Sequence, residues 1–390
     1  YYSVRNGDWN NTTAATPWAY GDSVWNYPNS AGINGQFVNW NIVRSLHNIN
    51  STGQDITLLG LKVESGKITM ANPSQTLNED NNGQGLWITH YLKLDGFVDL
   101  VGKSQLLQKK YNTAQIGESI LDATSSGYIE RDQKGQKNHF NYNYWSSPVS
   151  PINTVSNNTN YSVSGVMKDG TTTTPQDINW IGGLNGAPTS PISLARRWLY
   201  KFDNYSNAYA NWAQISENDP IRVGQGYIFK GTGAATANQN YTFKGKPNNG
   251  TIATNTVSSD QLLLTGNPYP SALNANKFIS DNINSIDGTL YFWDHYTTNN
   301  THVLGDYQGG YGVKNLTGGI APIAPSLISG RGSSSKIPNQ FIPIGQGFFV
   351  NGKIGSGGTV TYNNEQRAFY KENESSFSNT LFKTTDGTKK

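Results

Sequence analysis

A Gly-Gln-Gly element occurs twice in this chain, and no other sequence feature constrains the possible folds as strongly. Each copy closely follows an apolar residue and precedes three large apolar or aromatic residues. The two stretches are 221–229 and 342–350. Gln225 lies 77 positions after Pro148, and Gln346 lies 78 positions after Pro268. This near-equal spacing predicts that the second half of the chain is duplicated.

Two further landmarks recur in the same order around each copy. A Pro-marked turn occurs at 144–151 and 264–271, and an aromatic strand ending in Asp occurs at 199–203 and 290–294. The long insertions fall in different halves of the two copies, as surface loops on a shared scaffold tolerate. These variable loops are 155–190 and 300–338.

The recurring Gly, Gln and Pro positions are predicted to be structural. Glycine admits positive φ and close backbone approach, so each element fits a tight bend that leads into a buried strand. A phosphate-binding loop is excluded because neither a helix nor a Lys-Ser/Thr pair follows the glycines. The structural landmarks are Pro148, Gly224, Gln225, Gly226, Pro268, Gly345, Gln346 and Gly347.

The first half of the chain is a series of short alternating strands without a helical period. Leu59, Leu61 and Val63 share one face of such a strand, whereas Lys62 and Glu64 share the other. Serial short strands separated by Gly, Asn or Asp turns predict a parallel β-solenoid. An antiparallel sandwich is the alternative, because the spacing between strands is irregular.

An all-β protein with several domains is therefore expected. The prediction is an N-terminal β-solenoid-like (or sandwich) domain, two duplicated β-sandwich-like domains and a polar linker. Their predicted ranges are 1–115, 116–258, 259–368 and 369–390. The abundance of Asn, Ser, Thr, Gly and Tyr suits short strands, turns and exposed sheet faces.

Bulk composition excludes several classes of protein. The net charge is only +3 and no long basic run occurs, so nucleic acid is excluded as a partner. The chain has 0 Cys, which excludes disulfides and thiolate metal sites. The longest apolar runs, such as 261–264, have the length of strands rather than membrane helices. Because the sequence starts at Tyr1 without a signal peptide, we expect a processed product or a segment of a longer precursor.

No motif in the sequence predicts catalysis, a metal or a cofactor. The His residues lack metal-binding spacing, and adjacent Asp294 and His295 would point to opposite faces of a strand. Asp95 and Asp99 would lie about 13 Å apart on a regular strand, beyond the separation that glycosidases use. Glu130 and Asp132 flank Arg131, which favours a structural ion pair. Residues 80–83 resemble part of a calcium loop but lack its bidentate Glu.

Exposed aromatic residues are the predicted ligand contacts. Aromatic rings bind sugars by stacking, and several Tyr residues lie in Asn/Gly-rich loops. The alternative is that these rings only pack their loops. The candidates are Tyr205, Tyr209, Tyr296 and Tyr311.

Four phrases of the sequence resemble a family of secreted surface proteins from gliding and other Bacteroidota-type bacteria. They are 127–133, 142–148, 266–272 and 344–350. In that family such regions precede a C-terminal sorting domain of the type IX secretion system. The resemblance implies export through the translocon with outer-membrane shuttle components as partners, and display at the outer-membrane surface. The sorting domain itself is expected to have been removed after export or to lie outside this sequence.

The resemblance favours an exported, non-catalytic adhesin-type module that binds surface glycans or a substratum. The alternative is a carbohydrate-active enzyme or a glycan-binding appendage of one. A third hypothesis is that the chain matters mainly as secretion cargo. No catalytic residue, metal or cofactor enters the preferred hypothesis.

Overall fold

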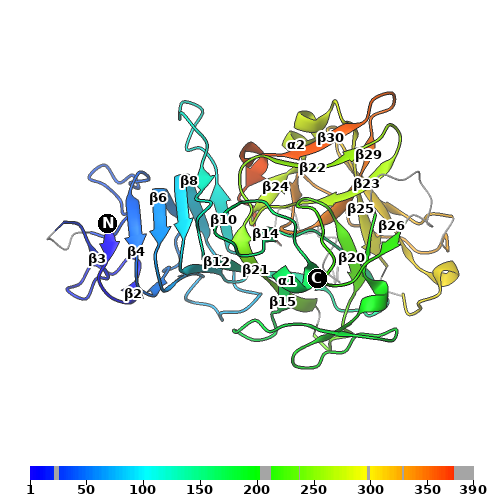
Figure 1. Ribbon diagram of the computed structural model, residues 1–390, viewed down its shortest axis with the longest axis horizontal. Helices are drawn as coiled ribbons and strands as arrows, with labels where there is room; N and C mark the ends of the chain where they lie inside the picture. Colours follow the sequence, from blue (N-terminus) through cyan, green and yellow to red (C-terminus); the bar gives the residue numbers. More distant parts are fainter. Residues whose placement is uncertain (22–25, 203–211, 237, 297–298, 327–328, 373–390) are drawn as a thin grey trace.

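The computed structural model describes residues 1–21, 26–202, 212–236, 238–296, 299–326 and 329–372. It is mostly β, with several sheets and few helical turns (Figure 1), so the predicted all-β class is confirmed. None of the helices in these ranges has the length and apolarity needed to span a bilayer. The helical segments are α1 (Val163–Val166), α2 (Ala275–Asn282), η1 (Arg196–Trp198), η3 (Leu304–Asp306) and η4 (Asn364–Gln366).

Two sheets make up the N-terminal half, and the chain passes back and forth between them (Figure 1). One contains, in order, β10 (Gln105–Gln108), β8 (Gly85–Leu94), β6 (Ile56–Val63), β4 (Ile42–Ser45), β1 (Tyr2–Ser3) and β3 (Trp18–Ala19), with β11 (Ile120–Leu121) also on β8. The other contains β14 (Val149–Ser150), β21 (Asn238–Pro247), β12 (Tyr128–Gln136), β9 (Phe97–Leu100), β7 (Lys67–Met70), β5 (Ile49–Asn50) and β2 (Gly7–Asp8), with β15 (Met167–Asp169) on β21.

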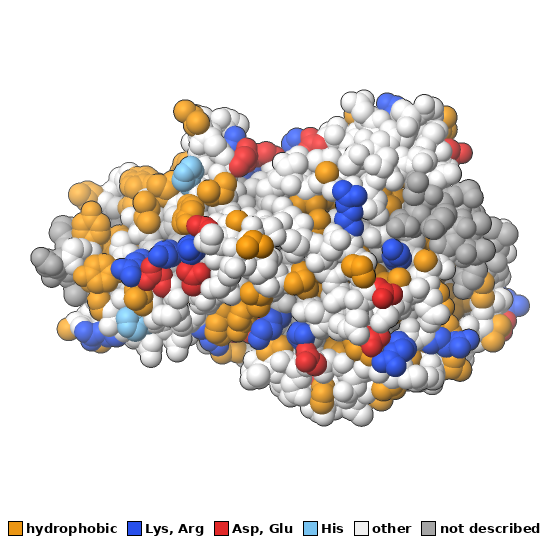
Figure 2. Space-filling view, in the orientation of Figure 1, with side chains coloured by type: hydrophobic (Ala, Val, Ile, Leu, Met, Phe, Trp, Pro, Cys, Tyr) orange, Lys and Arg blue, Asp and Glu red, His pale blue; other side chains and the backbone are white. Residues whose placement is uncertain are grey.

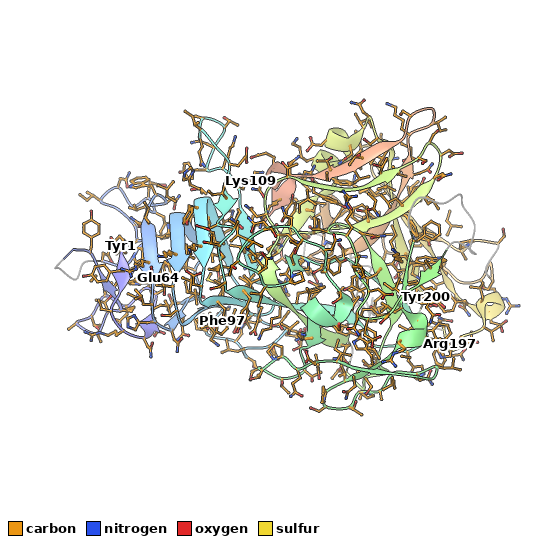
Figure 3. The ribbon with its side chains drawn as sticks, viewed as in Figure 1. Tyr1, Glu64, Phe97, Lys109, Arg197 and Tyr200 are labelled. Carbon is orange, nitrogen blue, oxygen red and sulfur yellow. The ribbon has the colours of Figure 1, made fainter. Side chains whose placement is uncertain are left out.

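The central strands of both sheets pair in parallel, whereas β3 on β1 and β21 on β12 are antiparallel. β4 pairs with β6 and β6 with β8, while β5 pairs with β7 and β7 with β9. Alternating side chains of both sheets point inward, so Leu58, Ile88, Ile68 and Val98 are fully buried in one core. Burial on this one face explains why these strands alternate apolar and polar residues. In Figure 3, Glu64 and Phe97 label the two sheets.

Smaller sheets make up the C-terminal half. They are β13 (Tyr142–Trp145), β20 (Tyr227–Lys230), β18 (Tyr200–Lys201) and β19 (Ala213–Gln214); β23 (Leu262–Gly266), β29 (Gly347–Gly352), β25 (Ile286–His295), β26 (Gly309–Lys314) and β27 (Gly319–Ile323); β28 (Phe341–Ile342), β24 (Ala272–Asn274) and β31 (Arg367–Ala368); β22 (Ile252–Val257) and β30 (Gly358–Tyr362); and β16 (Asn179–Ile181) and β17 (Ser193–Ala195).

The predicted landmarks occupy matching places in the strand pairing. In the first copy Trp145 pairs with Tyr227, and in the second Thr265 pairs with Phe348. The strand order around the two elements is also the same. In the first copy β20, which follows Gly-Gln-Gly, lies between β13, which precedes the Pro turn, and the aromatic strand β18. In the second copy β29 lies in the same way between β23 and β25.

Each Gly-Gln-Gly element contacts the Pro turn of the other copy. The Ser146 backbone nitrogen donates to the Gly345 oxygen over 2.9 Å, and the Gly266 nitrogen donates to the Gly224 oxygen over 3.1 Å. Gly224 has φ +79° and Gly345 has φ +60°, the left-handed region that favours glycine. Gln225 forms an isolated β-bridge with Thr265, and Gln346 forms the equivalent β-bridge with Trp145. Pro148 and Pro268 follow these contacting strands directly.

Strand pairing crosses two of the predicted boundaries. Residue 115 lies between β10 and β11, and the second sheet of the N-terminal half continues across this boundary from β9 through β12 to β21. Residue 258 follows β22, which pairs with β30 beyond it. Buried Arg367 also joins the two halves, because its guanidinium donates to the Leu106 oxygen and to Asn249. Of the predicted linker 369–390, the described part ends at residue 372.

Candidate functional site

An aromatic cluster fills the space where the β13-β20-β18 sheet meets the β23-β29-β25-β26 sheet. Because side chains alternate along a strand, Tyr142 and Tyr144 face this cluster, while Trp145 faces the main core. The cluster contains Tyr144, Phe202, Ile228, Leu264, Trp293, Tyr307 and Phe349, with Tyr142, Tyr200, Trp212, Leu262, Tyr291 and Tyr311 packed against it. Tyr200 is labelled in Figure 3 at this side of the molecule.

A pocket of about 90 Å³ opens among these rings. The Tyr311 ring lies 4.8 Å from that of Trp293, and its hydroxyl lies 3.3 Å from the Tyr144 hydroxyl. The volume is well below the roughly 300 Å³ of typical small-molecule sites, so the pocket suits one ring or one end of a ligand. Its lining residues are Tyr142, Tyr144, Tyr200, Trp212, Ile228, Trp293, Leu304, Tyr307 and Tyr311.

The hydroxyls of Tyr144 and Tyr311 in the pocket are neutral hydrogen-bonding groups at physiological pH. Burial raises the pKa of Tyr311 to about 12, although the hydrogen bond with Tyr144 opposes the shift. Burial also raises the pKa of Tyr144 well above its ordinary value. Because a phenol with a raised pKa keeps its proton at physiological pH, it cannot take a proton from a substrate. These groups therefore suit hydrogen bonding to hydroxyl groups rather than proton abstraction.

Lys230 lies directly behind the pocket wall. Its ammonium nitrogen is 4.7 Å from the ring centre of Tyr142, 5.3 Å from that of Tyr307 and 3.9 Å from that of Trp198. Burial lowers the pKa of Lys230 to about 7. Its Nζ lies 2.9 Å from Nδ1 of His302. The pKa of His302 is lowered to about 4 by burial and by Lys230, so the neutral imidazole accepts a hydrogen bond from the lysine through Nδ1.

Asp294 and His295 have separate partners and do not form a catalytic pair. The Asp294 carboxylate is 2.8 Å from the Lys336 ammonium. His295 Nε2 is 2.7 Å from the Tyr142 oxygen, and the Trp293 indole nitrogen approaches its ring. Burial lowers the pKa of His295 to about 3. In the neutral tautomer that donates from Nε2 to Tyr142, only Nδ1, 3.3 Å away, can accept from the Trp293 indole nitrogen.

Of the four predicted ligand-contact tyrosines, the structure places Tyr311 in the pocket. Tyr296 is only 4% exposed, and its hydroxyl donates to the Pro322 oxygen. It therefore packs its loop, which was the alternative interpretation of these residues. Tyr205 and Tyr209 lie outside the described residues. Tyr142, Tyr144 and Trp293 were not predicted as ligand contacts. The position of Tyr144 beside Trp145 on one strand was a usable signal, because adjacent strand residues face opposite sides.

A second, polar cleft contains carboxylates that the sequence argument treated separately. Asp99 on β9 and Glu130 on β12 are direct partners in the parallel pairing. With Asp132 they line a cleft of about 240 Å³. Burial raises the pKa of Asp99 to about 6; Lys67, 3.4 Å away, opposes the shift, and Asp132 and Glu130 add to it.

The other residues considered for chemistry have structural partners. Asp95 accepts from the Ser126 backbone, and the Asp80 carboxylate pairs with Lys134. The Arg131 guanidinium is buried and donates to the Gly102 oxygen. Within the described ranges, no cluster of three or more His, Cys, Asp or Glu side chains is arranged to hold a metal ion.

A family model described as a domain of unknown function, DUF8693, matches residues 48–390. The chain belongs to this family. The matched region begins after β4 and includes the aromatic pocket and the polar cleft. No curated protein and no solved structure matches the chain. The description of DUF8693 names no activity.

Proposed function

We propose that this DUF8693 protein is a non-catalytic binding module whose aromatic pocket receives a sugar ring. The observation that carries the proposal is the lining of the pocket, which consists of Tyr and Trp rings with two aliphatic side chains. The apolar face of a sugar stacks on such rings, while the neutral hydroxyls of Tyr144 and Tyr311 bond its hydroxyl groups. Tyr311 is the predicted ligand residue that lies in the pocket.

Binding to an array of surface glycans tests this function. Tyr311→Ala removes a stacking ring, so we expect binding roughly tenfold weaker, which corresponds to about 1.4 kcal/mol. Tyr311→Phe keeps the ring and loses only the hydroxyl, so it should retain most of the affinity. Tyr20→Ala is the control, since Tyr20 is an exposed tyrosine outside the pocket lining. Equal binding by Tyr311→Ala and Tyr20→Ala would refute the assignment.

The finer architecture belongs to the same proposal. We infer a solenoid-like N-terminal domain and two duplicated sandwich-like domains that present the pocket between them. Parallel pairing through β4, β6 and β8 supports the first inference. The matching strand orders around the two Gly-Gln-Gly elements support the second.

We further propose that the chain is an adhesin-type cargo of the type IX secretion system, displayed at the bacterial outer-membrane surface. Support comes from the resemblance of phrases such as 127–133 and 344–350 to surface proteins of gliding bacteria. The expected partners are the translocon and its outer-membrane shuttle components. Co-purification of the protein from cells tests this part: recovery with inner-membrane or cytoplasmic partners alone would contradict it.

Glycan cleavage at the polar cleft is the second candidate function. It is favoured by the raised pKa of half-buried Asp99, because a carboxyl that keeps its proton near pH 6 can act as a general acid. Glu130, its neighbour across β9 and β12, pairs with Lys244 at 3.0 Å. New reducing ends that disappear in both Asp99→Asn and Glu130→Gln would establish this function over the non-catalytic one.

A further inference from the structure

We propose a separate binding site for a neutral polysaccharide chain on the outer face of the N-terminal sheet that contains β4, β6 and β8. Trp40 and Tyr111 are its stacking platforms. This inference goes beyond the proposed function, because the site lies on the N-terminal sheet and shares no residue with the aromatic pocket. It concerns a groove of about 460 Å³. The groove is lined by Asn39, Trp40, Leu59, Thr89, His90, Tyr111, Asn112, Ala114 and Gln115.

Two large aromatic rings are exposed at this groove. Trp40 is 68% exposed and Tyr111 is 58% exposed. Figure 2 shows hydrophobic side chains gathered over this part of the molecule. Exposed aromatic groups around one groove mark binding sites more often than chance surface residues do.

The backbone around Tyr111 is held in place. The Gln115 amide accepts from the Tyr111 backbone nitrogen over 2.8 Å and donates to the Thr89 oxygen over 2.6 Å. An ion pair of 2.9 Å between Lys110 and Glu118 closes the base of the loop. This loop between β10 and β11 projects beside the sheet, and Lys109 marks its start in Figure 3. The Tyr111 ring is thereby carried on an anchored loop, which lowers the entropy that a ligand must remove.

A β-bulge shapes the floor of the groove. Leu58 pairs with Ile88 and Gly60 with Tyr91, so Leu59 of β6 faces two residues of β8, Thr89 and His90. Bulges re-aim side chains and are frequent next to binding sites. His90 is exposed, and its imidazole adds a hydrogen-bonding group to the groove lining.

The lining chemistry selects a neutral glycan. The groove presents amides from Asn39 and Asn112, the imidazole of His90 and two rings, and its lining contains neither Lys, Arg, Asp nor Glu. Farther along the strands, Glu64 pairs with both Arg44, 2.6 Å away, and Lys62, so these three side chains leave only one net positive charge beside the groove. An acidic polymer or a nucleic acid would need a net basic face. Sugars instead combine an apolar ring face with a rim of uncharged hydroxyls.

The groove is wide enough for a chain rather than one ring. Trp40 directly precedes the edge of β4, and Tyr111 is tied to β8, with β6 between them. Neighbouring strands lie about 4.8 Å apart, so the two platforms are separated by about 10 Å or more. A polymer crossing β4, β6 and β8 would therefore contact both rings with different sugar units.

Affinity measurements with soluble dextran, laminarin and arabinoxylan, and with alginate as an acidic polymer, test the proposal on the whole protein. We expect at least one neutral polysaccharide to bind, and Trp40→Ala and Tyr111→Ala each to weaken binding roughly tenfold. Ile354→Ala is the matched control, because Ile354 is 77% exposed and belongs to neither site. Both platforms are exposed, so thermal unfolding should be unchanged in all three variants.

Three results would overturn the proposal. They are absence of binding to every neutral polysaccharide, preferential binding of alginate, and self-association of the protein that Trp40→Ala abolishes. The test also separates this site from the aromatic pocket. Tyr311→Ala should bind the polysaccharide as wild type does. If the pocket binds no sugar, Trp40→Ala and Tyr111→Ala should still weaken polysaccharide binding, because they change only the groove.

Discussion

Replacing Gly347 with Ala tests whether the Gly-Gln-Gly elements hold the two copies together. A Cβ at this position would lie 2.8 Å from the Trp145 oxygen and 2.9 Å from its nitrogen. Both atoms are backbone, so no side chain can rotate away and a strand must move. Gly347 is not among the positive-φ glycines of the structure. Any loss of stability in Gly347→Ala therefore comes from the contact of the new Cβ with Trp145 and not from backbone strain.

The expected cost follows from the contacts that must shift. Overpacking a tight site costs about 1–3 kcal/mol. Moving the strand also weakens the bonds from Ser146 to Gly345 and from Asn267 to Gln346, of 2.9 and 3.0 Å, at about 0.5–1.5 kcal/mol each. We therefore expect a loss of about 2–6 kcal/mol. If the 390 residues unfold as one cooperative unit, with an unfolding entropy of about 2.1 cal/mol/K per residue, this loss lowers the unfolding temperature by about 2–7 °C.

Thermal unfolding followed by near-ultraviolet circular dichroism measures this change. Gly305→Ala is the control, because its Cβ would meet no atom within 4 Å and the variant should unfold within about 2 °C of wild type. Gly226→Ala should resemble Gly347→Ala, since its Cβ would lie 2.9 Å from the Thr265 oxygen. If both variants unfold together with Gly305→Ala, the two elements do not join the copies.

Two further predictions concern buried titratable groups behind the pocket. Burial lowers the pKa of Lys230 from 10.5 to about 7, so the unfolded chain binds more protons between these values and the free energy of unfolding rises with pH across that window. Lys230→Met should remove this rise without lowering stability at pH 7, as urea unfolding at several pH values will measure; an unchanged pH slope would contradict the burial argument. Burial lowers the pKa of His295 from 6.5 to about 3, so the free energy of unfolding falls as the pH drops from 6.5 towards 3. His295→Gln keeps a donor for the Tyr142 oxygen and should flatten this fall relative to wild type; identical acid profiles would refute it.

Local features of the fold were predictable from the sequence. The class follows from strand alternation, and the landmarks are visible because a bend at Gly224 or Gly345 depends on φ values that glycine adopts most readily. Alternation also predicts which residues of a strand share a face, as for Leu61 and Val63, both buried in the main core.

Contacts between distant segments were not predictable. Asp99 and Glu130 are neighbours only because β9 and β12 pair in one parallel register, and a shift of one residue would separate the carboxylates. The pocket combines Tyr144 from one copy with Trp293 from the other, which no local pattern specifies. Tyr296 lies in a loop sequence typical of exposed residues, yet it is buried because the chain around Pro322 covers it.

The central claim is that the chain binds glycans without cleaving them. The most direct measurement incubates the protein with the glycan that binds best and follows both bound complex and new reducing ends. The account predicts saturable binding that Tyr311→Ala weakens roughly tenfold, with no product over many hours. Appearance of new reducing ends that Asp99→Asn abolishes would contradict it.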